Sequence, residues 1–461
     1  MSQAQRSDAQ LGTEPIWRLI LRMGIPGLVA QLINLLYNLV DRMYIGHIPE
    51  VGQLALTGVG LTLPALQVIS AFSALVGNGG APLAAIALGQ GDRERAERIL
   101  GNGLLALLFF SAALTALFLG IRRPFLYMVG ASDATYPYAD DYIVIYLIGT
   151  VFVQLTLGLN PFITAQGQSR VAMLSILIGA AINIALDPVF IFALNLGVRG
   201  AALATVISQA ASAVWITSFL CRRDTSLRIR RDRLRPDVRI LLGVAALGVS
   251  PFIMSSTESL ISIVLSSGLA RYGGDLYVGS LTILQSVMQL ISIPMGGFTG
   301  GVAPIMSYNY GAGRPDRVKA TFVRLMAIGF SYSFLIALAA MVFPTAFARI
   351  FTSNAELVAL VGRVLPIFIA GMLIFGAQNV CQTGFMALGQ AKRSLLIALL
   401  RKVILLAPLA AVLPAITQNV MSIYWAEPVA DTLSAVTCLT VFVLFARRGG
   451  FRLGPATGER D

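Results

Sequence analysis

The sequence predicts an all-α membrane protein with twelve transmembrane helices in two pseudo-symmetric six-helix bundles. Of its 461 residues, 56% are hydrophobic and only 12% are charged, whereas soluble proteins carry about 25% charged residues. Apolar stretches close to the length that crosses a bilayer, about 20 residues, recur along the whole chain. Segments of the first half also recur in the second half at one fixed offset. Composition, span length and repetition therefore point to the same architecture.

The apolar stretches define the expected helices in order. Several exceed 25 residues, which indicates tilted helices or helices that extend beyond the bilayer. The organisation that follows is an N-lobe over 1–220, a basic linker over 221–240, and a C-lobe over 241–461 that ends in a short tail. The expected spans are 16–46, 54–88, 99–121, 138–164, 171–192, 201–220, 241–271, 276–310, 321–343, 361–388, 395–416 and 425–446.

Basic residues predict the orientation of the chain. Its formal net charge is +12, and in a membrane protein an excess of Lys and Arg marks the cytoplasmic side. When each basic residue is assigned to its nearer helix end, the side that carries both termini receives all but seven of the 34. The densest segment is 221–240, with eight arginines. We therefore expect a multi-pass protein of the inner (plasma) membrane with both termini in the cytoplasm, and no nucleic-acid partner. The seven exceptions are Arg42, Arg122, Arg123, Arg199, Arg271, Arg349 and Arg363.

An internal repeat relates the two halves. Residues 79–91 read GGAPLAAIALGQG and residues 301–313 read GVAPIMSYNYGAG. The same offset of 222 pairs TAQGQSR at 164–170 with MALGQAK at 386–392. Six helices per half make the repeat parallel, and parallel repeats surround a central site in many transporters.

Polar residues inside the predicted N-terminal helices are the sharpest functional signal. Ionisable groups are costly within a bilayer and mark functional sites by default. In the expected helix 171–192, Asn183 and Asp187 share one face, and Pro188 follows them. Two carboxylates brought together suit either a proton or a hard monovalent cation. The first helix carries one polar stripe, bordered by Tyr37 and made of Gln31, Asn34, Asn38 and Asp41. We expect Gln31, Asn34, Tyr37 and Asn38 to line a substrate cavity, and the alternative for the asparagines is a hydrogen-bonded seam between helices.

The C-terminal half offers a different polar set. Glu258 is the one carboxylate of its helix, and Glu427 and Asp431 lie on the last helix, with Glu427 near its start. The neutral residues fit either the lining of a substrate cavity or a hydrogen-bonded seam between helices. They are Gln285, Gln289, Gln378, Asn379 and Gln382.

Enzyme motifs are not found in the sequence. It shows no Walker loop, no HExxH, no GxSxG and no cofactor motif. Three cysteines at unrelated spacings indicate neither a metal site nor a disulfide framework. Without a nucleotide site, uphill transport would draw on an ion gradient.

The sequence resembles the MATE (multidrug and toxic compound extrusion) exporters. The resemblance rests on YNLVDRMYIGH at 37–47, on the two GxAP segments, and on the ALGQ turn at 387–390. It covers roughly 16–446. It implies a V-shaped pair of lobes and antiport of drugs against protons or sodium. It also implies a cation site, with sodium or a proton as the ion, at Asp41, Asn183, Asp187 and Thr205.

This chain differs from some members of that family in one respect. Some members have a further carboxylate on the tenth helix, where this chain has Ala377, Gln378 and Asn379. We therefore expect ion coupling in the N-lobe, and Glu258 to attract a cationic substrate or take a proton. The expected substrate is a small cationic or amphipathic molecule, the only other partner is the bilayer, and one chain suffices as a monomer. The alternative is a flippase of a lipid-linked saccharide precursor.

Overall fold

The computed structural model describes residues 10–452. Within that range the regular secondary structure is helical, and proline or a short turn interrupts several of the long helices. The first half contains α2 (Ile16–Gly46), α3 (Gly52–Gly89), α4 (Arg93–Met128), α5 (Tyr136–Ile148), α6 (Thr150–Ala165), α7 (Ser169–Pro188), η1 (Val189–Ala193) and α8 (Gly197–Leu220). The linker holds η2 (Arg231–Arg233). The second half contains α9 (Val238–Gly273), α10 (Asp275–Gly311), α11 (Pro315–Val342), α12 (Pro344–Phe351), α13 (Ala355–Phe368), η3 (Ala370–Leu373), α14 (Phe375–Ala387), α15 (Ala391–Leu399), η4 (Leu400–Leu406), α16 (Ala407–Thr417) and α17 (Met421–Arg447).

The number of spanning helices differs slightly from the expected twelve. Ten helices of the described region are long and apolar enough to cross a membrane, or eleven if the pair α5 and α6, bent by 58°, counts as one span. The remaining predicted span, 361–388, is present as α13 and α14 with the 3-10 turn η3 between them. The sequence pattern did not show that this apolar stretch is broken.

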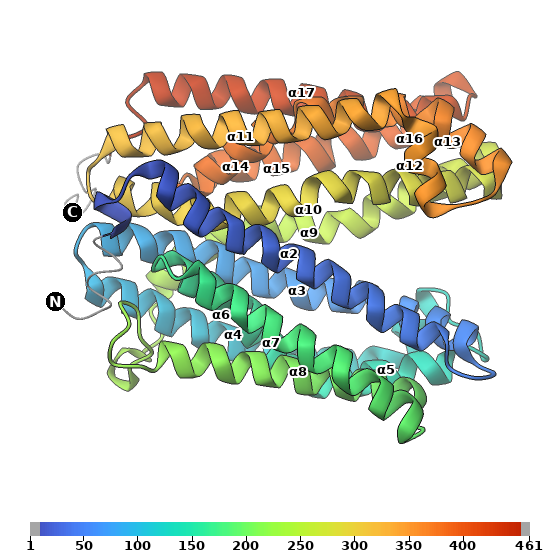
Figure 1. The fold of residues 1–461 in the computed structure, drawn as a ribbon, viewed down its shortest axis with the longest axis horizontal. Helices are drawn as coiled ribbons and strands as arrows, with labels where there is room; N and C mark the ends of the chain where they lie inside the picture. The colour runs from blue at the N-terminus through green and yellow to red at the C-terminus, as the bar shows by residue number, and fades with distance from the viewer. Residues whose placement is uncertain (1–9, 453–461) are drawn as a thin grey trace.

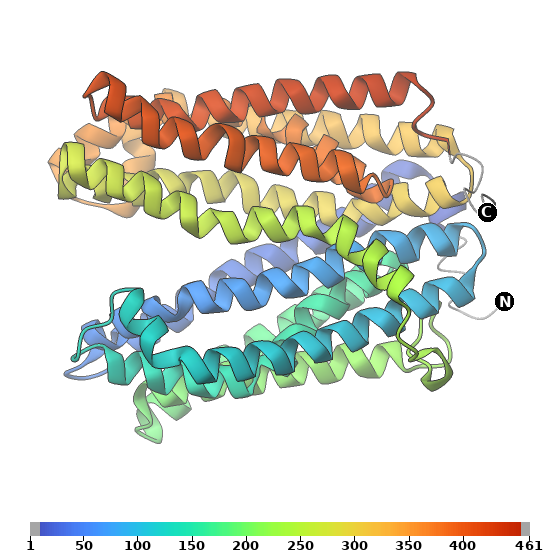
Figure 2. The ribbon, with the colours of Figure 1, turned by 180° about the vertical axis from the view of Figure 1, so that it is seen from behind.

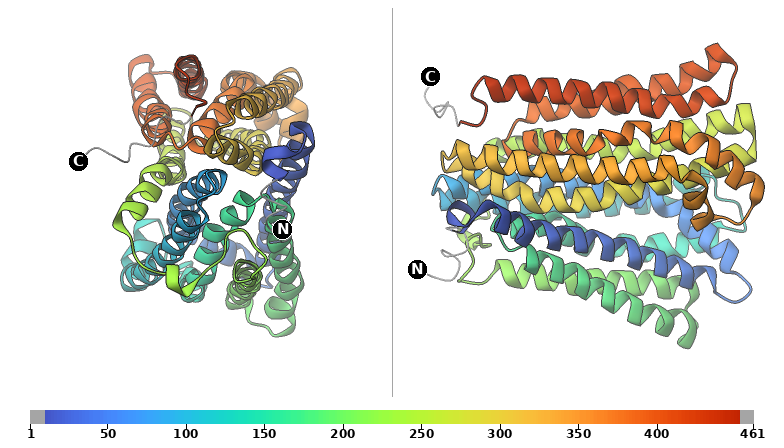
Figure 3. Two further views of the ribbon diagram at one scale, coloured as in Figure 1. Left: turned by 90° about the vertical axis from the view of Figure 1, so that its left-hand side faces the viewer. Right: turned by 45° about the horizontal axis from the view of Figure 1, so that its top comes forward.

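The helices of each half lie together along most of the molecule (Figure 1). The start of α2, the end of α17 and the 221–240 linker all lie at one end, here called the terminal end (Figures 1 and 2). Seen along the bundle, the second-half helices form one group and the first-half helices the other, with α2 beside the second group (Figure 3).

Two π-helical turns lie in corresponding helices of the two halves. The turn η1 follows Pro188, and η4 carries Arg401 and Lys402 between α15 and α16. Proline has no N–H to donate and disturbs the preceding turn. A π-turn reorients the side chains around it and often occurs at functional sites. Asp187 lies just before η1, and Arg401 and Lys402 lie within η4, so both turns can orient ionisable side chains.

Repeated glycines join the two halves at the terminal end. Gly89 of α3 abuts the α10 backbone at Tyr308, and Gly311 of α10 abuts the α3 backbone at Ile86. Gly79 abuts α9 at Val244, and Gly301 abuts α2. A Cβ at any of these four positions would collide with backbone atoms of the other half. The glycines of the repeat thus allow three close helix crossings, α3 with α10, α3 with α9 and α10 with α2, which pack the two halves tightly at this end.

Candidate functional site

Four polar side chains meet inside the first half. Asp41 comes from α2, Asn183 and Asp187 from α7, and Thr205 from α8, and each is at most 9% exposed. The Asn183 amide donates long hydrogen bonds to Asp187 Oδ1 at 3.4 Å and Thr205 Oγ1 at 3.5 Å. The Asp41 and Asp187 carboxyls lie close enough to interact electrostatically. The structure thus brings together the four residues that the resemblance singled out.

Several oxygens of this cluster lack a partner. Asp41 Oδ1, Asn183 Oδ1 and Asp187 Oδ2 are buried and accept no hydrogen bond from the described residues. Buried polar atoms are nearly always hydrogen-bonded, so such orphans need a specific reason. Three free oxygens and a hydroxyl in one place can surround a small hard cation, or two of the oxygens can share a proton.

Two tyrosines that sequence reasoning missed complete the N-half site. Tyr142 and Tyr146 lie one turn apart on α5, are both buried, and stack with ring centroids 6.1 Å apart. Tyr142 lies near Asp41 and Thr205. Their i, i+4 spacing was the only available signal, and it is equally typical of ordinary helix packing.

The polar stripe of α2 is divided between different surroundings. Gln31 packs against Gly297 of α10 and lines a cavity of about 420 Å³ between the two halves. Asn34 and Asn38 are joined by a bond from the Asn38 amide to the Asn34 carbonyl, and Asn38 is exposed. Tyr37 lies near Asp41. Neither asparagine nor Tyr37 lines this cavity or the larger one described next.

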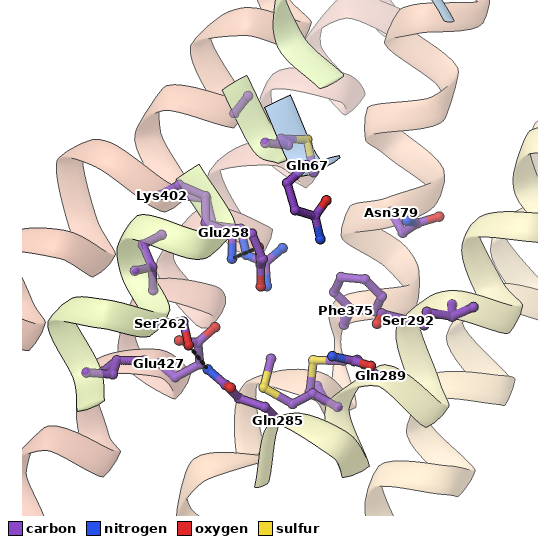
Figure 4. Close-up of a pocket in the computed structure, with 18 of the residues that line it drawn as sticks. Gln67, Glu258, Ser262, Gln285, Gln289, Ser292, Phe375, Asn379, Lys402 and Glu427 are labelled. Carbon is purple, nitrogen blue, oxygen red and sulfur yellow. Dashed lines mark hydrogen bonds and ion pairs between the residues drawn. The ribbon is translucent and has the colours of Figure 1, made fainter. Parts of the chain in front are cut away.

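The larger cavity, of about 880 Å³, lies mainly in the second half. Its wall contains the six C-half residues expected from the sequence, Glu258, Gln285, Gln289, Gln378, Asn379 and Gln382. Figure 4 shows most of them around one space, with Gln67 of α3 and Phe375 of α14. Met254 and Met288 add flexible apolar surface.

Two cationic side chains in this wall are buried inside the bundle, although the sequence predicted them at the cytoplasmic helix ends. Arg401 and Lys402 were counted with the basic residues at the cytoplasmic helix ends, but they lie within the bundle on η4. The Lys402 ammonium pairs with Glu258 Oε2 at 2.8 Å, and Arg401 Nε pairs with Asp431 Oδ1 at 2.7 Å. Lys402 is 5% exposed, whereas Glu258 is 67% exposed because it projects into the cavity (Figure 4). Glu258 therefore already has a cation beside it.

Several of the amide side chains also hold helices together. Gln382 donates to Ser250 Oγ, Ser394 O and Ser394 Oγ at 2.9–3.0 Å and so connects α14 with α9 and α15. Gln378 donates to Ser434 Oγ of α17 at 2.9 Å. Asn379 accepts from Thr299, and Gln285 donates to Ser262. These four combine the two alternatives left open by the sequence, since each lines the cavity and forms an interhelical bond.

Comparisons with known proteins agree with this architecture. Residues 26–189 and 251–412 match the MatE family model. The chain is 24% identical over 445 residues to the multidrug export protein MepA of Staphylococcus haemolyticus, covering 96% of each chain. It is 23% identical over 439 residues to MepA of Staphylococcus aureus, covering 94% of this chain and 95% of that one.

Solved structures share the fold over nearly the whole chain. One is a MATE protein in the bent conformation, with a TM-score of 0.89 at 21% identity over 97% of this chain and 98% of that one. Another is the outward-facing conformation of a multidrug resistance MATE family transporter, with a TM-score of 0.88 at 22% identity over 96% of this chain and 98% of that one. Because the family model matches well over half of the residues, in both halves, the chain belongs to the MatE family.

Proposed function

We propose that the chain is an ion-coupled exporter of cationic or amphipathic drugs, driven by a proton or a sodium ion that binds at Asp41 and Asp187. It works in the inner membrane as a monomer, with the terminal end in the cytoplasm. Family membership supports the proposal, as does similarity to multidrug export proteins over nearly the full length of both chains.

The observation that carries the proposal is the pair of adjacent carboxyls in the first half. A single charge at the bilayer centre costs about 2.5–3.5 kcal/mol on insertion scales, and two adjacent negative charges repel each other as well. A bound proton or monovalent cation removes one charge and occupies the orphaned oxygens. Entry of that ion down its gradient is then the energy source, because one charge moved across 100 mV releases about 2.3 kcal/mol. For an uncharged amphipathic substrate that energy sustains a roughly 40-fold concentration ratio. A monovalent organic cation leaving in a one-for-one exchange carries the same charge outward, so the concentration gradient of the ion drives its export.

The drug site of the proposal is the larger cavity. Its volume of about 880 Å³ lies within the range of small-molecule sites, about 300–1,000 Å³. Apolar side chains such as Phe375 and Met288 suit the body of an amphipathic molecule, and the amides suit its polar groups. Helix α2 links the two sites, since it carries Asp41 and also packs against α10, which forms one cavity wall.

Proteoliposomes test both the activity and its ion. We expect an imposed proton gradient or an imposed sodium gradient to drive ethidium accumulation, and Asp41→Asn to abolish it at wild-type protein levels. Asp224→Asn, which changes an exposed carboxyl of the linker, is the matched control and keeps wild-type flux. Wild-type flux in Asp41→Asn would remove that carboxyl from coupling. No accumulation under either gradient would refute the exporter itself.

A further inference from the structure

Five ionisable side chains from three elements meet at the wall of the larger cavity. Glu258 belongs to α9, Arg401 and Lys402 to η4, and Glu427 and Asp431 to α17. Four of them form two close ion pairs, Lys402 with Glu258 and Arg401 with Asp431. Within each pair the cation neutralises the carboxylate. Figure 4 shows the pair of Lys402 and Glu258 at the edge of the open space.

Glu427 is the fifth member and has no cation of its own. It is 3% exposed and lines the cavity, where Figure 4 places it near Ser262 and Gln285. No hydrogen bond or ion pair joins its carboxyl to another residue of the described region. The charged groups that face it are Asp431 from its own helix, Lys402 and Arg401 from η4, and Glu258 from α9. Both of the cations are already taken by the other two carboxylates.

The charge count of the cluster is therefore three carboxyls against two cations. With every group ionised, one negative charge remains uncompensated in a low-dielectric region, where an unpaired charge is strongly unfavourable. Either a proton or a bound monovalent cation can neutralise it. Both cannot do so together, because a cation next to a protonated Glu427 would leave one uncompensated positive charge instead.

We propose that Glu427 holds a proton when the cavity is empty and gives it up when a monovalent organic cation binds. The inference rests on the proposed function, because it assigns the ligand class of the same cavity. The exchange is balanced: the O–H bond of the Glu427 carboxyl breaks, the proton passes to water, and the substrate cation takes its place beside the carboxylate. Apolar neighbours such as Ile261, Phe368 and Met372 receive the rest of the ligand.

The two ion pairs explain why Glu427 performs this exchange rather than Glu258 or Asp431. A substrate cation at Glu258 would have to displace an ammonium that is tethered 2.8 Å away. At Asp431 it would have to displace a guanidinium at 2.7 Å. Glu427 presents an acceptor that no cationic side chain of residues 10–452 occupies. The C-half therefore contains a proton site of its own, separate from Asp41 and Asp187.

Proton release on ligand binding tests the proposal. We use the full-length protein in detergent with Asp41→Asn and Asp187→Asn as background, which removes the carboxyls of the first half. Tetraphenylphosphonium is the probe, and a pH indicator in weak buffer counts released protons. We expect up to one proton per bound cation, and an affinity that weakens about tenfold per pH unit on the acid side. Adding Glu427→Gln abolishes both effects, whereas Glu427→Asp and the exposed control Glu356→Gln retain them.

The outcomes separate this inference from the proposed function. If wild-type protein binds no tetraphenylphosphonium at any pH, the cavity is not a site for organic cations and the proposed function fails. If the probe binds but the Glu427→Gln protein releases as many protons as its parent, Glu427 is not the exchanging group. If Glu427→Gln does not fold, the protein with Asp41→Asn and Asp187→Asn alone tests the exchange. An affinity of that protein for tetraphenylphosphonium that does not change with pH contradicts the exchange.

Discussion

Replacement of Gly311 by alanine tests whether the repeated glycines close the terminal end of the molecule. Gly311 is the last residue of α10 and lies against the backbone of α3. A Cβ built there would be 2.8 Å from the carbonyl carbon of Ile86 and 3.0 Å from its Cα. Carbon atoms prefer separations of about 3.5–4.0 Å, so the two helices must move apart by about 0.7 Å or more.

The energetic cost follows from this overlap. The colliding atoms belong to backbone and cannot rotate away, so we assign the usual overpacking penalty of about 1–3 kcal/mol. If the penalty applies only when the two halves are closed at this end, it favours the open arrangement by a factor of about 5–150. Gly89→Ala should act similarly, because its built Cβ would lie 2.9 Å from backbone atoms of Tyr308 and Ala312.

Cysteine labelling measures this shift. Ser307 lies one turn before Gly311, is 1% exposed and lines the smaller cavity. In a Cys221→Ser background, which removes the exposed native thiol, Ser307→Cys reports access from the terminal end to a membrane-impermeant maleimide. We expect Gly311→Ala to speed labelling about 5–150-fold, and Gly300→Ala, whose Cβ meets open space on the same helix, to leave it unchanged. The Ser307→Cys parent is compared with its Gly311→Ala and Gly300→Ala variants. If all three fold and are labelled at the same rate, these glycines do not close the terminal end.

Three further predictions concern the second half. Gln382→Ala removes three interhelical bonds and should lower the free energy of unfolding by about 1–3 kcal/mol, seen as a lower melting temperature in detergent with little change in ethidium affinity. Gln289→Ala removes a cavity amide for which the described residues provide no hydrogen bond, so it should weaken ethidium binding and leave melting unchanged; the reverse pattern would contradict both assignments. Arg401→Met leaves the 2%-exposed Asp431 without its cation and should cost about 3–5 kcal/mol of stability, and adding Asp431→Leu should recover most of that loss. If the double variant melts no higher than Arg401→Met, the ion pair is not the source of the loss.

Much of the N-half site was readable from the sequence. Asp41, Asn183 and Asp187 stand out because polar residues are rare in apolar spans. Their helical spacing shows which of them share a face. Thr205 came only from resemblance to a family, since one threonine in a spanning helix carries no signal of its own. Tyr142, its neighbour on α5, went unnoticed for the same reason.

The C-half cluster could not be derived in this way. Lys402 pairs with Glu258 of a helix far away in the chain, and no local period links them. Arg401 and Lys402 also lie near enough to a helix start to suggest side chains that extend to the membrane surface. Only packing shows that η4 turns both inward and that no cation of the described part of the chain pairs with Glu427.

The sequence by itself determined that the chain is helical and membrane-spanning, that its halves repeat, and that its polar content is concentrated in particular helices. Those properties follow from composition and from short-range periodicity, which each segment carries alone. The tertiary structure decided which charges are paired, which amides join helices, and which glycines meet across the two halves. Those properties depend on contacts between distant segments, and contacts of that kind exist only after the helices have packed.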